Sequence, residues 1–477
     1  MYSDDTIVAI SPPSGRGGIG VIRLSGPTSL DIAALLFRSE RLSPQSSALS
    51  PSDLSPSLLE PNRAVFGHIV DPASSEPIDE VVLTCFKAPR SYTGEDVVEL
   101  SCHGSPVILR RVLELVTARG ARIAEPGEFT FRAFLNKRID LAQAQAVRDV
   151  INAQTEYQAR VAIRQLDGAL SKRLTPLKEA VVEVIVHLES SVEFVEDDIS
   201  PEASAALSDK LERTVEGLRG IAASFSFGRF VKEGFDLAIV GRPNVGKSSV
   251  FNRLIGSDRA IVTELPGTTR DALYESTSIS GVPVRLIDTA GIRETIDIVE
   301  TIGISRSRSA IADADISLLV LDASRQLEQD DVDLLDFVPE TDRIIALNKT
   351  DLENYLDEQL YDETGVHVWE LYGNVVSISA LTGNGFDELT SKIFERLSGD
   401  AAAERDDIML TDARQHAGVQ RSIEQLSDAH RLMISGELEE IILLKLRAGI
   451  EALGEVTGET LTEDILGQIF STFCIGK

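Results

Sequence analysis

The chain contains few cysteines. Only Cys85, Cys102 and Cys474 occur among its 477 residues. Three scattered cysteines argue against a disulfide framework and fit a reducing compartment. Their spacing from the histidines matches no zinc motif. The composition therefore does not indicate a secreted, disulfide-stapled protein or a zinc-dependent one.

Long apolar runs are also missing. No stretch reaches the roughly 18 apolar residues that a membrane-spanning helix needs. The first ten residues, MYSDDTIVAI, lack the basic region that opens a signal peptide. We therefore expect no membrane span and a cytoplasmic protein.

Positive charge is scarce. The chain has 46 Lys and Arg against 76 Asp and Glu, a net charge of −30 and a pI of about 4.6. Such a chain repels phosphate backbones over most of its surface, so binding of nucleic acid would require a local basic patch or a partner that supplies one. Apolar residues are plentiful at 43%, enough for the two to four packed domains that this length suggests.

The sequence GRPNVGKS at 241–248 is the strongest motif in the chain. It follows the apolar run Leu237–Val240 and precedes a helical pattern, so it fits G-x-x-x-x-G-K-[ST] between a strand and a helix. In this arrangement, backbone N–H groups and a helix N-terminus surround phosphates. Lys247 can reach the outer phosphates, and the Ser248 hydroxyl can bind Mg²⁺. The residues expected to line the loop are Asn244, Val245, Gly246, Lys247, Ser248 and Ser249.

Later strand ends predict that the nucleotide is guanine. An apolar run leads into Asp288, Thr289, Ala290 and Gly291, where the carboxylate suits an outer-shell Mg²⁺ contact and the glycine lets an N–H approach the γ-phosphate. Asp351 can accept two N–H donors that guanine offers and adenine does not. The bracing residues are Asn348 and Lys349, and the strand end that presents an N–H to the guanine oxygen is Ser379 and Ala380. This block resembles the GTPase domain shared by Ras-like and Era-like proteins.

The expected water-positioning residue is missing. Ile292 directly follows the glycine of D-x-x-G, where Ras-like proteins have a glutamine that orients the attacking water. The same loop carries Arg293, Glu294, Asp297 and Glu300, and a carboxylate there can position or polarise water. The alternative is that these are exposed loop charges, and the residues alone leave both interpretations open.

A second loop, IVTELPGTTRD at 261–271, is expected to contact the nucleotide. Thr269 is placed to bind Mg²⁺ with its hydroxyl and the γ-phosphate with its N–H. The amide oxygen of Asn244, together with backbone carbonyls, can hold a monovalent cation that neutralises charge as an arginine finger does. The alternative is that Asn244 is only a turn residue.

Periodicity gives the organisation of the chain. The segment 6–26 predicts two short strands around a Gly/Pro turn, and 39–62 is a Ser/Pro-rich surface insertion. Apolar residues at three-to-four spacing predict helices over 141–227 and again after residue 400. The simplest architecture inserts a GTPase domain, about 234–400, into one helical domain built from both flanks.

Four further segments are more specific than a generic GTPase. They are DTIVAISPPSGRGGIGVIRLSG near the N-terminus, SYTGEDVVELSCHGSPVILRRVL at 91–113, PGEFTFRAFLNKRIDLAQAQAV at 126–147 and FCIGK at 473–477. With GRPNVGKSS, PGTTRD and DTAGIRE, they closely resemble the MnmE (TrmE) family, GTPases that modify wobble uridine in tRNA. The resemblance covers essentially the whole chain apart from the Ser/Pro-rich insertion.

The resemblance implies a multidomain α/β plus all-α fold: a mixed α/β N-terminal folate-binding domain, a helical domain, and an inserted Ras-like P-loop GTPase domain. The expected limits are 1–136 for the N-terminal tetrahydrofolate-binding and dimerisation domain, 137–233 and 401–477 for the two parts of the helical domain, and 234–400 for the GTPase domain. The second helical part would end in the CIGK motif.

The resemblance also implies roles for the nucleotide loops. Glu300 falls at the family's catalytic glutamate, and Arg293 would assist the switch. Ser248 and Thr269 would bind Mg²⁺. Asn244, Thr268 and the carbonyls of Thr263 and Leu265 would hold K⁺. The residues of this loop expected to surround GTP or GDP are Thr263, Glu264, Leu265, Pro266, Gly267, Thr268 and Thr269.

A folate site is implied at Arg23, Glu99, Arg138 and Lys477, for 5-formyl- or 5,10-methylene-tetrahydrofolate. A carboxylate such as Glu99 can receive the amino and ring N–H edge of a pterin, and cations suit its glutamate tail. Arg138 stands where the family usually has lysine, so the charge is kept but the geometry is not. Cys474 lies near the folate in the family, and both packing and catalysis stay open for it.

Together these interpretations predict a homodimeric, K⁺-activated GTPase. With an FAD-dependent partner, MnmG, in a heterotetramer or larger complex, it would add an aminomethyl or carboxymethylaminomethyl group to C5 of the wobble uridine (position 34) of tRNA, using a tetrahydrofolate one-carbon unit. The alternative is an Era- or Der-like ribosome-assembly GTPase, although neither a KH domain nor a second P-loop is apparent. A third possibility is a nucleotide-switched scaffold with negligible catalysis, which slow, K⁺-insensitive hydrolysis would favour.

Overall fold

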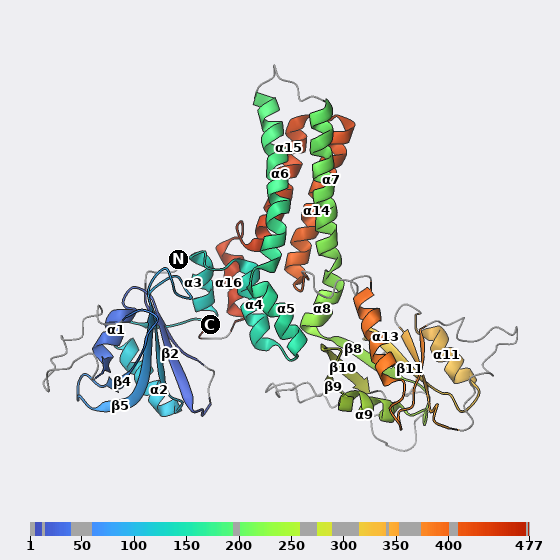
Figure 1. Cartoon of the computed structure of the whole chain (residues 1–477), viewed down its shortest axis with the longest axis horizontal. Helices are drawn as coiled ribbons and strands as arrows, with labels where there is room; N and C mark the ends of the chain where they lie inside the picture. The colour runs from blue at the N-terminus through green and yellow to red at the C-terminus, as the bar shows by residue number, and fades with distance from the viewer. Residues whose placement is uncertain are drawn as a thin grey trace. The chain divides into compact units, whose positions relative to one another are not determined.

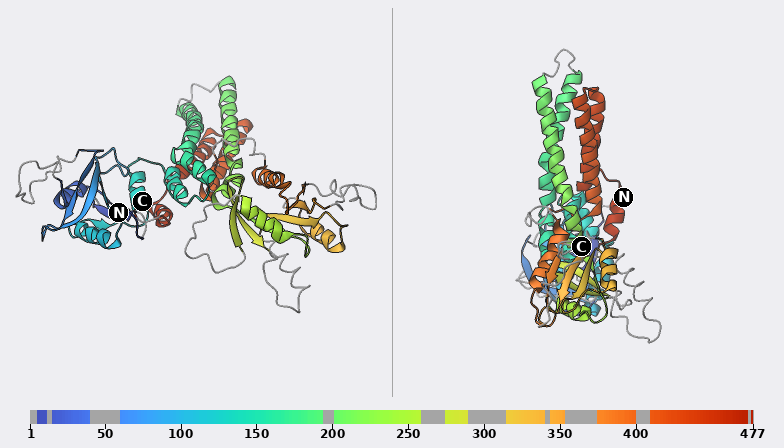
Figure 2. Two further views of the ribbon diagram at one scale, coloured as in Figure 1. Left: turned by 60° about the horizontal axis from the view of Figure 1, so that its bottom comes forward. Right: turned by 90° about the vertical axis from the view of Figure 1, so that its right-hand side faces the viewer.

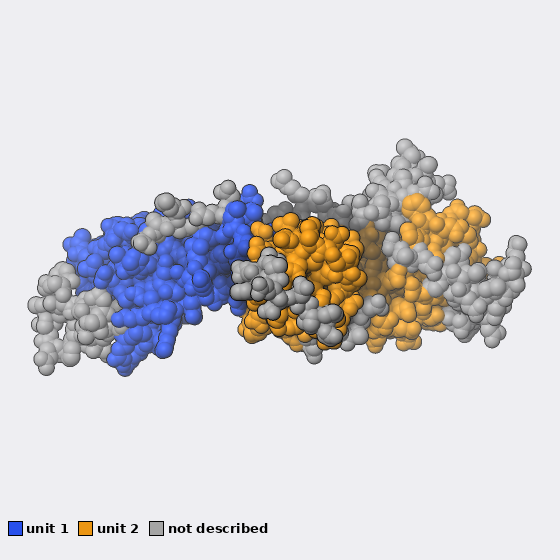
Figure 3. Space-filling view, turned by 90° about the horizontal axis from the view of Figure 1, so that it is seen from above, with its two compact units in different colours: residues 1–148, 454–477 blue, residues 149–453 orange. Residues whose placement is uncertain are grey.

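The computed structural model describes residues 5–11, 15–39, 60–193, 201–257, 274–288, 314–339, 343–352, 374–399, 409–473 and 476. The chain forms two compact units (Figure 3), one of residues 1–148 and 454–477 and the other of 149–453. The predicted insertion at 39–62 lies almost wholly outside the described residues. No helix in the described ranges is long and apolar enough to cross a membrane.

The first unit is built on a seven-stranded sheet with the order β3-β4-β5-β6-β2-β1-β7. Its elements are β1 (Ile7–Ser11), β2 (Ile19–Ser25), α1 (Ser29–Leu36), β3 (Phe37–Arg38), β4 (Ala64–Val70), β5 (Pro77–Phe86), β6 (Val97–His103), α2 (Pro106–Thr117), β7 (Arg122–Ile123) and α3 (Glu128–Leu135). The predicted pair of strands in 6–26 is confirmed as the antiparallel hairpin β1–β2.

Burial alternates along these strands, as it does where one face of a sheet is covered. Residues such as Ile22, Leu83 and Leu100 are buried and pack with side chains of α1 and α2 in one hydrophobic cluster. The opposite face carries Arg23 and Glu99, and both are only partly buried. The sheet therefore presents these two charged residues on its less covered face.

The C-terminal residues belong to this same unit. Helix α16 (Glu463–Ser471) packs against α3, where Phe470 lies 4.9 Å from the ring of Phe131 and 5.1 Å from that of Phe473. The beginning of α4 (Leu141–Asn152) adds Leu141 to the cluster. These aromatic contacts bring the end of the chain back to the N-terminal domain.

The second unit contains long helices from both sides of the GTPase segment. They are α5 (Glu156–Leu166), α6 (Ala169–Glu193), α7 (Pro201–Ala223), α8 (Phe225–Glu233), α14 (Ala413–Ser435) and α15 (Glu439–Thr457). Helices α6, α7, α14 and α15 run side by side (Figures 1 and 2), with α7 packed on α6 and α14. Asp412 caps α14 by accepting from two backbone N–H groups, and Gly436 ends the helix in the left-handed conformation.

The GTPase segment folds as a six-stranded sheet with the order β13-β12-β11-β8-β10-β9. All neighbours are parallel except the edge pair β9–β10. The elements are β8 (Phe235–Val240), α9 (Lys247–Ser257), β9 (Tyr274–Ile279), β10 (Val282–Asp288), β11 (Ile316–Asp322), α11 (Gln329–Phe337), β12 (Arg343–Asn348), β13 (Val375–Ser377) and α13 (Phe386–Ser398). Helices α8, α9 and α13 contribute to the cluster on one face and α11 to the cluster on the other.

This topology positions the predicted motifs. In an open parallel sheet, ligands bind beyond the carboxyl ends of the strands. Four apolar runs form the parallel strands β8, β10, β12 and β13. They lead into the P-loop, Asp288, Asn348 and Ser379, respectively. Their loops therefore meet at one edge of the sheet.

Candidate functional site

The P-loop leaves β8 and enters α9 through a backbone that requires glycine at one position. Gly246 has φ +102°, and a Cβ atom there would lie 2.2 Å from Nδ2 of Asn348. A side chain at this position would be strained and would clash. Asn244 and Ser248 are exposed, whereas Val245 is 5% exposed and anchors the loop in the core. The loop thus curls tightly, with its polar residues outward.

Asn348 joins the P-loop to the loop at 379–385, which we call the base loop. Its Nδ2 donates to the carbonyl of Val245 at 2.9 Å, and its Oδ1 accepts from the N–H of Ala380 at 2.9 Å. The side chain is 2% exposed, so both bonds are shielded from water. One amide therefore fixes the distance between the two loops.

Lys349 makes a second connection to the P-loop. Its Nζ donates to the carbonyl of Asn244 at 2.8 Å and lies 2.6 Å from Oδ2 of Asp322, at the end of β11. Burial raises the pKa of Asp322, but hydrogen bonds from Lys349 and Ser324 outweigh it and hold that pKa below its usual range. The carboxylate is thus charged at neutral pH and holds the lysine in place.

The remaining described residues of the predicted site lie nearby. The Ser379 hydroxyl donates to Oδ1 of Asp351 at 2.6 Å, which orients the carboxylate predicted to read guanine. Nζ of Lys247 donates to the P-loop carbonyl of Arg242 at 2.7 Å. Ser248 and Ser249 lie exposed in the first turn of α9. The structure therefore brings the P-loop, the Asn348–Asp351 motif and the base loop together.

Several predicted site residues fall outside the part of the chain that the structure describes. They are Thr263, Glu264, Leu265, Pro266, Gly267, Thr268, Thr269, Thr289, Ala290, Gly291, Arg293, Glu300 and Lys477, together with Cys474 and the side chain of Asp288. The backbone of Asp288 ends β10 beside Ile239 of β8.

In the first unit, Arg23 and Glu99 are direct partners across β2 and β6. Nε of Arg23 donates to Oε1 of Glu99 at 2.8 Å, and Nη1 donates to the carbonyl of Gly476 at 3.2 Å. The guanidinium also lies 6.0 Å from the ring centre of Tyr92 and 5.8 Å from that of Phe129. The cluster therefore joins two strands, two aromatic rings and the residue before Lys477.

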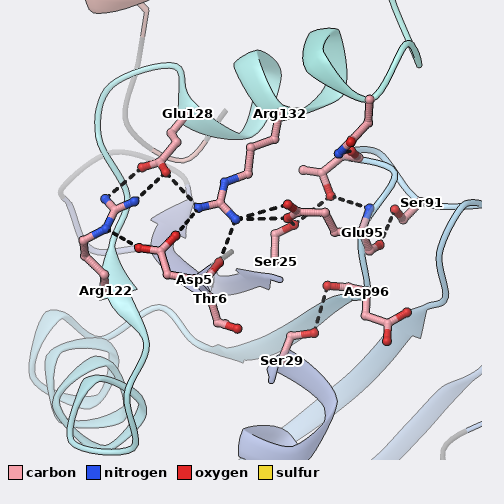
Figure 4. Close-up of polar contacts among 12 residues, drawn as sticks. Asp5, Thr6, Ser25, Ser29, Ser91, Glu95, Asp96, Arg122, Glu128 and Arg132 are labelled. Carbon is pink, nitrogen blue, oxygen red and sulfur yellow. Dashed lines mark hydrogen bonds and ion pairs between the residues drawn. The ribbon is translucent and has the colours of Figure 1, made fainter. Parts of the chain in front are cut away.

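A buried ion network secures the segment that carries Tyr92 (Figure 4). Arg132, 4% exposed on α3, contacts carboxylates of Asp5 at 2.6 Å, Glu128 at 3.0 Å and Glu95 at 3.2 Å. Glu95 also accepts from the Ser25 hydroxyl at 2.6 Å. The network thus links β2 and α3 to the segment before β6.

Arg138 contacts this same segment by donating from Nε to the carbonyl of Ser91 at 3.1 Å. Three of the four predicted folate residues, Arg23, Glu99 and Arg138, therefore bond to one another or to the segment 91–99. The fourth, Lys477, follows Gly476, whose carbonyl contacts Arg23.

Comparison with known proteins identifies the family of this chain. The chain matches the family model "GTP-binding protein TrmE N-terminus" over residues 6–138 and the model "MnmE helical domain" over 141–474. A protein named tRNA modification GTPase MnmE from Koribacter versatilis is 46% identical over the full length of both chains. Its namesake from Aquifex aeolicus is 42% identical over 99% of this chain and 100% of its own. The chain belongs to the MnmE family of tRNA modification GTPases.

Among solved structures, Era of Aquifex aeolicus is 26% identical, covering 40% of this chain and 66% of its own, with a TM-score of 0.27. The multidomain fold class predicted from the sequence is confirmed by the family matches and by the observed sheets and helices.

Some residues of the nucleotide site and of the Arg23 cluster were not predicted from the sequence of this MnmE-family chain. Asp322 has a usable signal, because it ends the buried parallel strand β11 at the edge where ligands bind. Tyr92, Phe129 and Arg132 have none, because their importance comes from partners far away in the chain.

Proposed function

We propose that this MnmE-family GTPase hydrolyses GTP in a K⁺-activated cycle that serves the modification of wobble uridine in tRNA. The observation that carries the proposal is the bridge made by Asn348 between Val245 of the P-loop and Ala380 of the base loop. That bridge sets the spacing between a phosphate cradle and a purine-binding loop. The full-length family match adds the tRNA context.

Guanine selection rests on Asp351. Its carboxylate is oriented by the Ser379 hydroxyl at 2.6 Å, which leaves acceptor capacity for the two N–H groups of a guanine edge. The N–H of Ala380, bonded to Oδ1 of Asn348 at 2.9 Å, would also donate to the guanine O6 as a shared hydrogen bond, so the bridge stays in place. Adenine offers neither the donor pair nor that acceptor.

The metal sites rest on oxygen donors, as Mg²⁺ and K⁺ prefer. Ser248 and Thr269 would hold Mg²⁺, with Asp288 in the outer shell. Asn244, Thr268 and the carbonyls of Thr263 and Leu265 would hold K⁺. Asn244 and Ser248 fit this role, because both residues are exposed in the P-loop and carry oxygen donors. K⁺ supplies positive charge near the β- and γ-phosphates when bound.

Hydrolysis would depend on Glu300, with Arg293 assisting. Ile292 cannot orient water, so a carboxylate further along the same loop would accept a hydrogen bond from the attacking water and align it with the γ-phosphate.

The one-carbon donor would bind as a tetrahydrofolate at the cluster of Arg23 and Glu99, with Arg138 and Lys477 nearby. The contact between Arg23 and Gly476 supports this, because Gly476 directly precedes Lys477 in the sequence and lies against the strand residue Arg23. Glu99 would take the pterin edge, and the cations would take the glutamate tail.

The chain would act as a homodimer with an FAD-dependent partner, MnmG, in the cytoplasm. The less covered face of the N-terminal sheet supports dimerisation, because Ile19, Phe66 and Val82 are 66%, 56% and 37% exposed there. The net charge of −30 supports a shared task, in which the partner supplies much of the surface that binds tRNA.

The test is mass spectrometry of tRNA nucleosides from a strain that lacks the gene. We expect the C5-aminomethyl-type wobble uridines to disappear, to return with the wild type and the surface control Lys392→Ala, and to stay absent with Lys247→Ala or Glu300→Ala. Unchanged wobble uridines together with an accumulating ribosomal precursor would instead support an assembly GTPase of the Era type.

A further inference from the structure

Arg253 in α9 contacts the base loop from the side of the P-loop helix. Its Nη2 donates to the carbonyl of Leu381 at 3.3 Å, and its guanidinium lies 5.8 Å from the ring centre of Phe386, the first residue of α13. Phe386 is 6% exposed and belongs to the GTPase core. The arginine therefore connects α9, the helix that follows the P-loop, to the base loop at Leu381 and to the start of α13.

Gly383 provides a second, independent sign of this packing. A Cβ atom at Gly383 would lie 2.4 Å from Nη2 and 2.9 Å from Cζ of Arg253. The backbone there has φ +94°, which only glycine adopts readily. The guanidinium thus fills the space beside the loop backbone, and the loop rests directly on it.

Internal bonds give the base loop its shape but do not fix its position. Gly383 N–H donates to the carbonyl of Ser379 at 2.8 Å, and Thr382 N–H donates to the Ser379 hydroxyl at 3.1 Å. On the inner side, Ala380 N–H is held by Asn348. On the outer side, the Leu381 side chain is 80% exposed and adds little packing. Among the residues that the structure describes, Arg253 contacts the loop on that outer side.

We propose that Arg253 is a positioning residue for guanine: it holds the base loop so that the N–H of Ala380 can meet the guanine O6. This rests on the proposed function, and it names the residue that keeps the base seated. Helix α9 begins at Lys247 and also carries Arg253. The same helix would therefore help to position both the phosphates and the base of the nucleotide.

The inference predicts that substitution of Arg253 lowers nucleotide affinity by an amount that depends on the base. Arg253→Ala should raise the Kd of GDP and of inosine diphosphate by the same factor, about tenfold, because both ligands carry O6 and the lost contact is a charge-assisted bond. The diphosphate of 2-aminopurine riboside lacks O6, so its Kd should change less than about twofold. The turnover number for GTP at saturation should stay within about twofold of the wild type, because the described contacts of Arg253 are with the base loop and Phe386.

The measurement is displacement of a ribose-labelled fluorescent GDP from the full chain by each ligand. Arg253→Lys keeps the charge but not the planar fork, so it should give an intermediate Kd for GDP. Arg229→Ala is the matched control, because that arginine also lies over a phenylalanine, at 5.0 Å, and pairs with Asp315, away from the base loop. Thermal unfolding checks that each variant is folded.

Two results would overturn the inference. One is an unchanged Kd for GDP in Arg253→Ala. The other is an equal loss for the ligand without O6, which would mean that the whole domain has loosened. Failure of the proposed function looks different, because the wild-type chain itself would then fail to prefer GDP over ADP.

Discussion

The hydroxyl of Thr155 donates a hydrogen bond of 2.6 Å to the carbonyl of Gly281, so the start of α5 is tied to the turn between β9 and β10. Tyr157 packs on the same turn, since a Cβ atom at Gly281 would lie 2.8 Å from the Cβ of Tyr157. Strand β9 follows the predicted loop 261–271, and β10 ends at Asp288. The turn is thus joined in sequence to both predicted nucleotide-sensing loops.

We expect Thr155→Val to separate hydrolysis from tRNA modification. The substitution keeps the shape but removes the bond to Gly281 and the cap that Thr155 gives to Gln158, a loss of about 1–3 kcal/mol in the free energy of unfolding. GTP turnover should stay within about twofold, while modified nucleoside formed per GTP hydrolysed should fall. Parallel assays of both quantities check this. Thr155→Ser retains the hydroxyl and should behave as wild type, and an equal fall in both quantities would contradict the coupling.

The P-loop glycine gives a second prediction. Gly246→Ala should abolish GTP binding, because the new methyl group would meet Nδ2 of Asn348 and the backbone has φ +102°. Gly256→Ala, in the helix α9 that follows the P-loop, has open space around the position and should leave binding unchanged and raise stability by up to about 1 kcal/mol. Equilibrium titration with labelled GDP and thermal unfolding of both variants check this. Normal GDP binding by Gly246→Ala would show that the loop adopts another path.

Motifs near one another in the sequence predicted much of the fold. The P-loop lies between a strand and a helix, and the strands before Asp288, Asn348 and Ser379 are all present as β10, β12 and β13. These elements are local, so hydrophobic pattern and turn chemistry suffice to find them. The apolar spacing likewise predicted helices on both flanks of the GTPase segment, and the structure shows that α7 and α14, one from each flank, pack together.

Contacts between distant charges were beyond sequence reasoning. Arg23 bonds to Glu99 and to Gly476, which are 76 and 453 residues away, and nothing local selects them from the chain's other carboxylates and carbonyls. Without the family resemblance, the sequence alone would identify Arg23 and Glu99 as ordinary charged residues in strands. The partners of Arg132 and Arg253 are fixed in the same way, by the three-dimensional path of the backbone.

The buried network in Figure 4 predicts a dependence of stability on pH. Burial raises the pKa of Glu128, but hydrogen bonds from Arg122, the Glu125 N–H and Arg132 outweigh it, and the net pKa lies below the ordinary value of 4.5. A carboxyl with a depressed folded pKa stabilises the fold above its unfolded pKa, and this stability is lost as the pH falls through the folded value. The melting temperature should therefore drop as the pH falls below about 4.5.

Thermal unfolding between pH 7 and pH 3 tests this. Glu128→Gln should unfold at a lower temperature at pH 7 and should show a shallower drop below pH 4.5, because its side chain does not titrate. Glu114→Gln is the control, since the Glu114 side chain is 57% exposed and forms an ion pair with Arg111 at 3.4 Å. An identical acid slope in wild type and Glu128→Gln would exclude Glu128 as the source.

The cluster around Arg23 predicts that a substitution there weakens folate binding in the first unit and leaves nucleotide binding unchanged. Arg23→Lys should weaken binding of 5-formyl-tetrahydrofolate by about tenfold or more and leave GDP affinity unchanged, because an ammonium cannot hold Glu99 and the Gly476 carbonyl with the same planar fork. Calorimetric titration of the full chain with each ligand checks this. Arg63→Lys is the matched control, since Arg63 is 64% exposed and pairs only with Glu60 among its described ion pairs. Unchanged folate affinity in Arg23→Lys would show that the ion pair with Glu99 stabilises the sheet and does not shape a ligand site.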